Sequence, residues 1–424
     1  MSDTMERVES VQTNETDGAV QCAVTDINMD ANVKENRKKT RRQRNKGVLK
    51  GFVFGVLLSG CAVLAYYRYF MDDIKKQELL RGCIDQYYLE AVDDEAITEG
   101  IYKGMIEALG DPYSEYLTVE ENTVREQEYE GSYKGIGVVL QQDPDTGLVT
   151  VVSCYEGSPA QEAGILEGDI LYMVNGEEIA EKELDEAVAI IKSAGDEGVA
   201  LTLIRNGQSD FIEVNVVPND IVYPVVSHQM LEDGIGYLAI EVFKESTYQQ
   251  FHDALEDLKS QGMRGLIVDL RNNTGGLLNS VNDILRDILP EGIIVYTVDK
   301  YGNREEYTSA GETPLEIPMV VMVNGYTASA SEIFAGAVRD YEMAKLVGTQ
   351  TFGKGVVQST LQLTDGSALK LTIANYYTPN GTNINGTGLE PDEVVELDMT
   401  PLEDGTYVDN QLAKGVEVLK EMLQ

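Results

Sequence analysis

The chain has 424 residues, of which 43% are hydrophobic and 25% are charged. This length and composition allow two or three domains with a buried core, and they exclude a wholly disordered protein. Acidic residues outnumber basic ones by 72 to 33, which gives a net charge of −39, and a charge of this sign argues against nucleic acid as a partner.

An apolar stretch near the N-terminus predicts a membrane anchor. Residues 51–67 carry no charged side chain; a helix of this length is near the short limit for crossing a bilayer, and flanking residues extend the predicted anchor to residues 47–70. Nine basic residues precede or open the stretch: Lys34, Arg37, Lys38, Lys39, Arg41, Arg42, Arg44, Lys46 and Lys50. By the positive-inside rule, residues 1–46 form a cytoplasmic tail, expected to be disordered, and the rest of this single-pass protein lies outside the cytoplasm.

Three alternatives to a membrane-spanning helix remain for this stretch. A buried core helix would need apolar neighbours to enclose it, and a cleaved signal peptide would not follow so long a charged leader. The residues preceding Cys61 also fit the short pattern of lipoproteins, although the apolar run continues past that cysteine. The four cysteines are too few and too scattered for a disulfide framework, and no cysteine or histidine cluster predicts a metal site.

Three regions follow the anchor. Apolar residues at helical spacing predict two helices, near 74–90 and 95–109, in a helical neck over residues 71–130. Residues 131–217 contain short β-rich runs and read as a compact domain. From 218 to 424 strands and helices alternate, which predicts an α/β layered core. Its expected elements are strands at 236–242, 265–270 and 318–323, helices at 246–261 and 328–341, and β runs at 356–363 and 367–377.

The sequence disfavours a hydrolase with a serine–histidine triad. Its two histidines, His228 and His252, lie in contexts without glycine-rich neighbours, and no G-x-S-x-G elbow is present. A serine and a lysine can do the same chemistry, because a desolvated lysine loses its proton near neutral pH and can then accept one from a hydroxyl.

Ser329 and Lys354 are the candidates for such a pair. Ser329 stands where a predicted strand ends and a helix begins, so that the amide of Ala330 and the helix dipole would favour a developing oxyanion. Lys354 lies in a glycine-flanked turn. Taken alone, Ser329 and Glu332 also fit a plain S-x-x-E capping box, and a lysine between glycines is commonly a solvated turn residue.

Residues 328–340 and 347–358 resemble the active-site signature of the C-terminal processing (tail-specific) peptidases, the S41 family of serine proteases. In that family the serine 25 positions before the lysine is the nucleophile, which here selects Ser329 rather than Ser331. The resemblance makes Lys354 the general base and Gln358 the residue that orients it. It implies a Ser–Lys dyad, with no metal and no cofactor.

The resemblance extends to residues 109–117, 265–278, 376–381 and 388–392. It implies a mixed α/β layered catalytic core of the crotonase or ClpP-like kind. The second of these segments has Thr274 where the family usually has proline, but its two glycines are present. By similarity, a backbone amide of either Gly275 or Gly276 joins Ala330 in the oxyanion hole.

The β-rich region resembles a PDZ domain, the module that this family inserts before its catalytic core. Gly135, Ile136, Gly137 and Val138 would form its carboxylate-binding loop, and residues 157–169 match the helix and turn that follow. Successive amides of such a loop receive the C-terminal carboxylate of a peptide, while the peptide adds a strand to the sheet edge.

These observations predict a membrane-anchored serine endopeptidase that processes or degrades extracytoplasmic proteins after its PDZ domain has bound their C-terminal tails. The resemblance also suggests that the PDZ domain gates the site and that a homodimer forms through the helical parts. The alternative is a catalytically inactive, membrane-tethered PDZ protein that only binds peptides.

Overall fold

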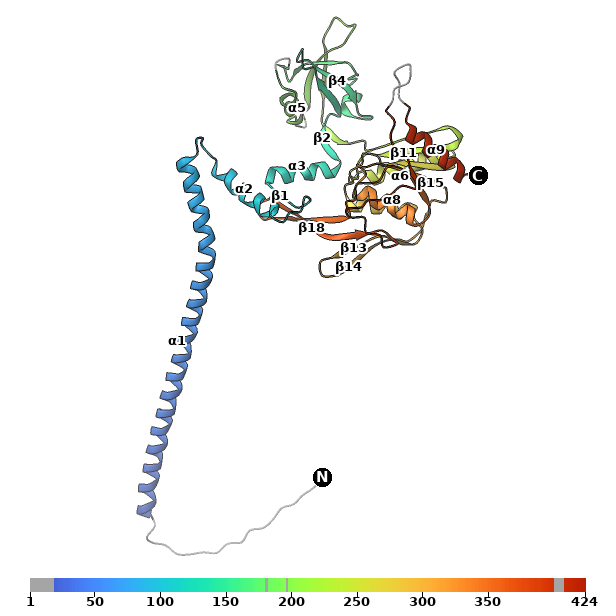
Figure 1. Cartoon of the computed structure of the whole chain (residues 1–424). Helices are drawn as coiled ribbons and strands as arrows, with labels where there is room; N and C mark the ends of the chain where they lie inside the picture. The colour runs from blue at the N-terminus through green and yellow to red at the C-terminus, as the bar shows by residue number, and fades with distance from the viewer. Residues whose placement is uncertain (1–18, 180–181, 196, 400–407) are drawn as a thin grey trace. The chain divides into compact units, whose positions relative to one another are not determined.

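The computed structural model describes residues 19–424, apart from 180–181, 196 and 400–407 (Figure 1). The chain divides into two compact units, residues 1–97 and 98–424. Described by itself, the first unit consists of α1 (Ala19–Tyr87) and the first residues of α2 (Asp94–Glu107). The apolar side chains of Phe52, Leu57 and Leu64 in α1 are more than half exposed.

Helix α1 contains the predicted anchor. Within it, Arg37–Tyr66 is long and apolar enough to cross a membrane, although a signal sequence passes the same test of length and composition. Of the tail predicted over residues 1–46, residues 19–46 are helical in this structure, and the first 18 residues lie outside the described chain. The physical reason is cooperativity, since adding a turn to an existing helix is far easier than starting a new one.

The second unit begins with a segment that joins the α/β core before the β-rich region with the predicted PDZ fold starts. Strand β1 (Glu115–Leu117) pairs antiparallel with β18 (Ala368–Tyr377). Helix α3 (Val119–Glu130) follows; the Thr118 hydroxyl accepts from the Glu121 amide at its start, and Gly131 ends it with φ 69°. The predicted neck therefore contains a strand of the core sheet as well as helices.

The PDZ region has a six-stranded antiparallel sheet. Five strands lie in the order β3-β4-β5-β7-β8, with β6 paired to β5. Their bounds are β3 (Val138–Gln142), β4 (Val149–Cys154), β5 (Ile170–Val174), β6 (Glu177–Glu178), β7 (Val199–Ile204) and β8 (Ile212–Val216), with helices α4 (Pro159–Glu162) and α5 (Leu184–Lys192). A separate two-stranded ribbon of β2 (Ser132–Gly135) and β9 (Asn219–Val222) joins this region to the core. Strands β2 and β3 are separated by Ile136 and Gly137, which belong to neither strand.

The α/β core of residues 218–424 is built on a six-stranded sheet in the order β10-β11-β12-β15-β16-β19, parallel except for β10. Its strands are β10 (Val226–Met230), β11 (Ile235–Ile240), β12 (Gly265–Asp269), β15 (Met319–Val323), β16 (Ala344–Gly348) and β19 (Glu393–Val394), and the short helix η1 (Glu232–Gly234) precedes β11. Parallel strands are covered on both faces, so they read as continuous apolar runs. The fully buried β15 fits this rule.

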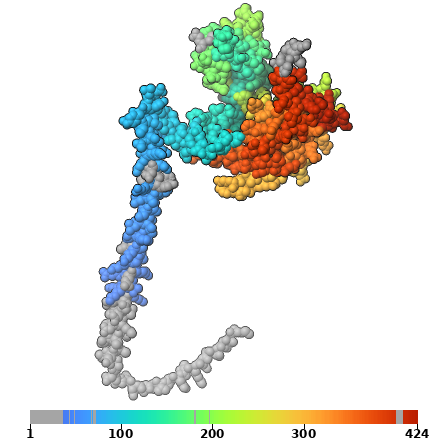
Figure 2. All heavy atoms as spheres, in the orientation of Figure 1, coloured from blue at the N-terminus to red at the C-terminus, as the bar shows by residue number. Residues whose placement is uncertain are grey.

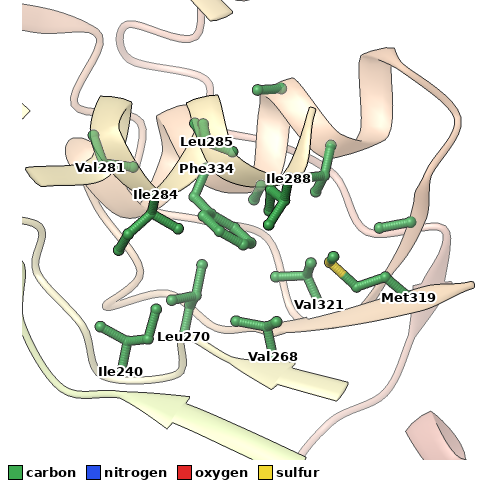
Figure 3. Close-up of a cluster of buried hydrophobic side chains, with 14 of the residues drawn as sticks. Ile240, Val268, Leu270, Val281, Ile284, Leu285, Ile288, Met319, Val321 and Phe334 are labelled. Atoms are coloured by element: carbon green, nitrogen blue, oxygen red, sulfur yellow. The ribbon is translucent and has the colours of Figure 1, made fainter. Parts of the chain in front are cut away.

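Helices cover both faces of this sheet. On one face α6 (Thr247–Ser260), α7 (Leu278–Ile288) and α8 (Ala330–Asp340) pack over the strands, with Phe334 of α8 in the same cluster as Val321 of β15 (Figure 3). On the other face Val320 and Met322 contact the cluster of α9 (Asn410–Met422). Helix α9, dark red in Figure 2, is visible at the surface of the core. Successive side chains of β15 thus point to opposite faces of the sheet, and the helices on both faces give the predicted layered α/β architecture.

A second sheet of the core has the order β1-β18-β13-β14, with β17 on the other side of part of β18. Its remaining strands are β13 (Gly292–Asp299), β14 (Arg304–Ser309) and β17 (Val356–Gln362). The β runs expected at 356–363 and 367–377 are β17 and β18. This sheet brings the segment before the PDZ region next to the loop that contains Lys354.

Candidate active site

All six core residues singled out from the sequence line one cavity of about 570 Å³. They are Ser329, Ala330, Lys354, Gln358, Gly275 and Gly276. The cavity lies wholly within residues 98–424, where β15, α8, β17 and β18 meet. Much of its remaining lining is apolar or aromatic, including Val242, Leu277, Ile333, Val356, Tyr113 and Tyr376.

Ser329 stands in a tight turn between β15 and α8. Its backbone has φ 55° and ψ −118°, a conformation that costs a non-glycine residue about 1–3 kcal/mol. Hydrogen bonds hold the turn on both sides: the Ala328 amide donates to the Asn273 carbonyl at 3.1 Å, and the Ser331 hydroxyl donates to the same oxygen at 3.0 Å. Such a turn presents a side chain at a fixed place at the cavity wall.

The N-terminus of α8 begins directly after this serine. Ser329 is the N-cap residue, and its amide donates to a Glu332 carboxylate oxygen at 2.9 Å. The capping role and a role in chemistry are therefore compatible at this position. Within the described chain the amide of Ala330 has no hydrogen-bond acceptor, and it lies at the positive end of the helix dipole.

Two glycines approach the serine from the loop after β12. A Cβ atom on Gly275 would lie 2.8 Å from the Ser329 Cβ, and one on Gly276 would lie 2.1 Å from the Phe243 carbonyl oxygen. Their φ angles of 108° and 136° also require glycine. The Gly275 amide donates to the Asn273 side chain at 2.9 Å, whereas the Gly276 amide has no acceptor among the described residues. Gly276 is therefore the one of the pair whose amide is available to a ligand.

Lys354 lies in the loop between β16 and β17, with its ammonium nitrogen 4.7 Å from the centre of the Tyr113 ring. Burial lowers the pKa of its amine below the ordinary value, and the positive charge of Lys370 lowers this pKa further. Carboxylates of Asp111, Glu115 and Glu332 act in the opposite direction. In the described chain no hydrogen bond joins this amine to the Ser329 hydroxyl, although the two residues share the cavity.

Glu332 links the serine turn to the lysine loop. Its fully buried carboxylate accepts hydrogen bonds from the Ser329 and Lys354 amides, each at 2.9 Å. It also accepts from the Thr351 hydroxyl at 2.5 Å and the Gly353 amide at 2.8 Å. Burial raises the pKa of this carboxyl, while the four hydrogen bonds oppose the rise. The sequence indicated only its capping partner, because the loop contacts come from a separate part of the chain.

Gln358 lies on β17 and lines the cavity, but its side-chain nitrogen donates to Thr372 Oγ1 at 3.3 Å and to the Val356 carbonyl at 3.4 Å. No contact of Gln358 with Lys354 occurs among the described hydrogen bonds. Sequence reasoning missed Tyr376, a fully buried residue of β18 whose hydroxyl donates to the Ser329 carbonyl at 3.1 Å. A tyrosine in a strand gives no signal of such a contact.

The PDZ region has a separate groove of about 240 Å³. All four predicted loop residues, Gly135, Ile136, Gly137 and Val138, line it, together with α5 residues Val188, Ile191 and Lys192. Strand β3 pairs only with β4, so its other edge has no strand partner in the described sheet. Gly137 has φ 73°, and a Cβ there would lie 2.4 Å from the Ser158 Cβ. An edge strand beside an apolar groove is the arrangement that accepts an added peptide strand.

Both histidines lie outside the cavity. His228 contacts Asp257 at 2.9 Å and His252 contacts Asp287 at 3.1 Å. Neither histidine is near the proposed serine and lysine, so the structure gives neither of them a place in this cavity.

Comparison with known proteins identifies both regions. Residues 234–395 match the model of peptidase family S41, residues 150–205 that of a PDZ domain, and residues 58–121 that of the activating protease CtpB N-terminal domain. A carboxyl-terminal-processing protease from Synechocystis is 37% identical over 69% of this chain and 69% of its own length. The chain belongs to peptidase family S41.

Other relatives of this S41 peptidase carry similar names. The carboxy-terminal processing protease CtpA of Bacillus subtilis is 34% identical, over 80% of this chain and 73% of its own. Among solved structures, a photosystem II D1 C-terminal processing protease is 28% identical, with a TM-score of 0.44 over 75% of this chain and 87% of its own. The chain is thus a serine protease of the carboxyl-terminal processing type with a PDZ domain.

Proposed function

We propose that this S41 peptidase is a membrane-anchored endopeptidase that cuts extracytoplasmic proteins with Ser329 and Lys354. The observation that carries the proposal is that both side chains line one cavity in which burial lowers the pKa of the lysine. A neutral amine at this position can act as a base, which a solvated surface lysine cannot do near neutral pH.

The proposed reaction has two stages. Neutral Lys354 accepts the hydroxyl proton of Ser329, whose oxygen attacks the scissile carbonyl. The amides of Ala330 and Gly276 stabilise the resulting oxyanion, since each lacks another acceptor in the described chain. The lysine then gives its proton to the leaving amine, and water releases the acyl-enzyme by the same steps in reverse order. Gln358 would help to orient the lysine only if its side chain turns away from Thr372.

Substrate selection is proposed to reside in the PDZ groove. An unstructured apolar C-terminus would pair with the edge of β3, with its carboxylate on the loop of Gly135 to Val138. The apolar lining by Ile136, Val188 and Ile191 supports this choice of side chain. Gating of the protease by occupancy of this groove stays a prediction, and so does a homodimer formed through the helical parts.

Membrane attachment is proposed through α1. Its apolar side chains between residues 52 and 64 are exposed, and no other described element of the same unit packs against them. The basic residues before this stretch favour a cytoplasmic N-terminus and an extracytoplasmic protease. This topology is tested by labelling intact cells with a membrane-impermeant thiol reagent. The natural cysteines are replaced, and a single cysteine is placed at Ser2 or at Ser359. Labelling at residue 2 would contradict the proposed topology.

The proposed dyad is tested by cleavage of an unfolded reporter with an apolar C-terminal tail. The full-length protein in detergent is compared with its Ser329→Ala and Lys354→Ala variants. We expect both variants to lose activity by at least about 1000-fold, because residues that act as one unit each remove most of the catalysis. Equal turnover by all three proteins would refute the mechanism.

A further inference from the structure

We propose that Tyr113, in the segment before the PDZ domain, is a positioning residue of the active site whose ring face stabilises the ammonium that Lys354 becomes during catalysis. The inference rests on the proposed dyad, since it concerns the proton that Lys354 takes from Ser329. It assigns a part in the reaction to a residue outside both active-site segments of the sequence.

The contact itself is the first observation. The Lys354 nitrogen lies 4.7 Å from the centre of the Tyr113 ring, and Tyr113 lines the same cavity as the serine. A cation within about 6 Å of the face of an aromatic ring is attracted by its quadrupole, and the attraction grows when water is excluded. Both side chains are half-buried. The ring therefore covers the lysine and offers its protonated form a partner.

The segment that holds Tyr113 is fixed to the core by its neighbours. The Asp111 carboxylate accepts from the Tyr113 amide at 3.2 Å and from the Ser114 hydroxyl at 2.5 Å. Ser114 Oγ in turn accepts from the Thr372 amide on β18 at 3.0 Å. Directly afterwards β1 pairs with β18, with Glu115 opposite Lys370. The ring is thus held against the strands that form the wall of the cavity.

The surroundings explain why a ring suits this place. Three carboxylates act on the charge of Lys354: Asp111 and Glu115 from the segment that holds Tyr113, and Glu332 from α8. The positive charge of Lys370 on β18 opposes them. A further carboxylate in direct contact would hold the proton on the resting lysine and remove the base. A neutral ring attracts the cation more weakly, so it aids the protonated intermediate while leaving the resting amine able to lose its proton.

Substitutions that keep the shape of the ring test the inference in the full-length protein. Tyr113 is replaced by phenylalanine and then by phenylalanines that carry one, two or three ring fluorines, which weaken the negative face of the ring step by step. We expect Tyr113→Phe to keep kcat/KM within about 3-fold, and the most fluorinated ring to lower it by roughly 3- to 30-fold. The acidic limb of the pH profile should move to lower pH along the series, because the ammonium loses its partner.

Two outcomes separate this inference from the dyad on which it rests. A flat series, in which kcat/KM and the acidic limb do not change with fluorination, overturns the role of Tyr113 even if Lys354→Ala is inactive. Activity retained in Lys354→Ala overturns the dyad instead. Tyr113→Leu with an unchanged melting temperature serves as the non-aromatic reference; wild-type kcat/KM in this variant would also overturn the inference.

Discussion

Replacing Glu332 with glutamine tests the link between the nucleophile turn and the lysine loop. One carboxylate oxygen accepts from Thr351 Oγ1 and the Gly353 amide, and the other accepts from the Ser329 and Lys354 amides. A glutamine side chain keeps one acceptor oxygen, and its NH₂ group would face two donors. Two hydrogen bonds to a charged group are then lost.

The expected cost follows from those two bonds. At about 1.5–3 kcal/mol each, they amount to about 3–6 kcal/mol, which is a large share of the 5–15 kcal/mol that stabilises a typical domain. Catalytic activity should fall together with stability, because the backbone amides of both proposed catalytic residues donate hydrogen bonds to this carboxylate. The chain has no tryptophan, so urea unfolding is best followed by the circular dichroism of its tyrosines, together with reporter cleavage.

A surface glutamate provides the matched control. Glu312 is exposed, and Glu312→Gln should leave the unfolding midpoint and kcat/KM unchanged. If Glu332→Gln shows the same midpoint and the same activity as this control, the reasoning that this buried carboxylate holds the two loops together is wrong.

Two further predictions concern the lysine and the glycine loop. Burial lowers the pKa of Lys354 most, and the charge of Lys370 lowers it further, so removing that charge in Lys370→Gln should raise this pKa. The acidic limb of the kcat/KM profile then moves to higher pH, and activity at pH 7 falls. Gly276→Ala should lose at least about 100-fold in kcat/KM, since the added methyl would lie 2.1 Å from the Phe243 carbonyl oxygen and must displace the loop. Steady-state kinetics across pH measures both.

Matched variants separate these effects from general damage. Lys345 is exposed and outside the cavity, so Lys345→Gln should leave the pH profile in place. Gly302 has φ 84° but nothing within 4 Å of an added Cβ, so Gly302→Ala should cost backbone strain without loss of catalysis. A shift of the limb to lower pH in Lys370→Gln, or full activity in Gly276→Ala, would contradict the assignments.

Local patterns predicted the surroundings of Ser329 well. The apolar run before it became the buried strand β15, and the helix expected at 328–341 is α8, which starts at Ala330. These elements could be predicted because the apolar run, the glycines and the S-x-x-E pattern are contiguous in the sequence. The proposal that Ser329 acts together with Lys354 needed the family resemblance, since each residue alone fits an ordinary structural role.

Contacts between distant segments were not predictable in the same way. Nothing in the residues around Tyr113 indicates that β1 pairs with β18, because the strand has only three residues and its register is set by the finished core. The side chain of Gln358 contacts Thr372 for the same reason: β17 and β18 form a hairpin whose cross-strand neighbours the sequence does not specify. The helix over residues 19–46 was missed because polar composition says little about a segment that extends an apolar helix.

The pairing of β1 with β18 also bears on how the enzyme is made. The Lys370 amine contacts the Glu115 carboxylate across 255 positions of sequence, with the whole PDZ region between them. Contacts of such separation form late, since the chain entropy of closing the intervening loop is lost before the contact is gained. A growing chain cannot complete its cavity until β18 has been synthesised, so the protease stays without its assembled site during most of its own synthesis.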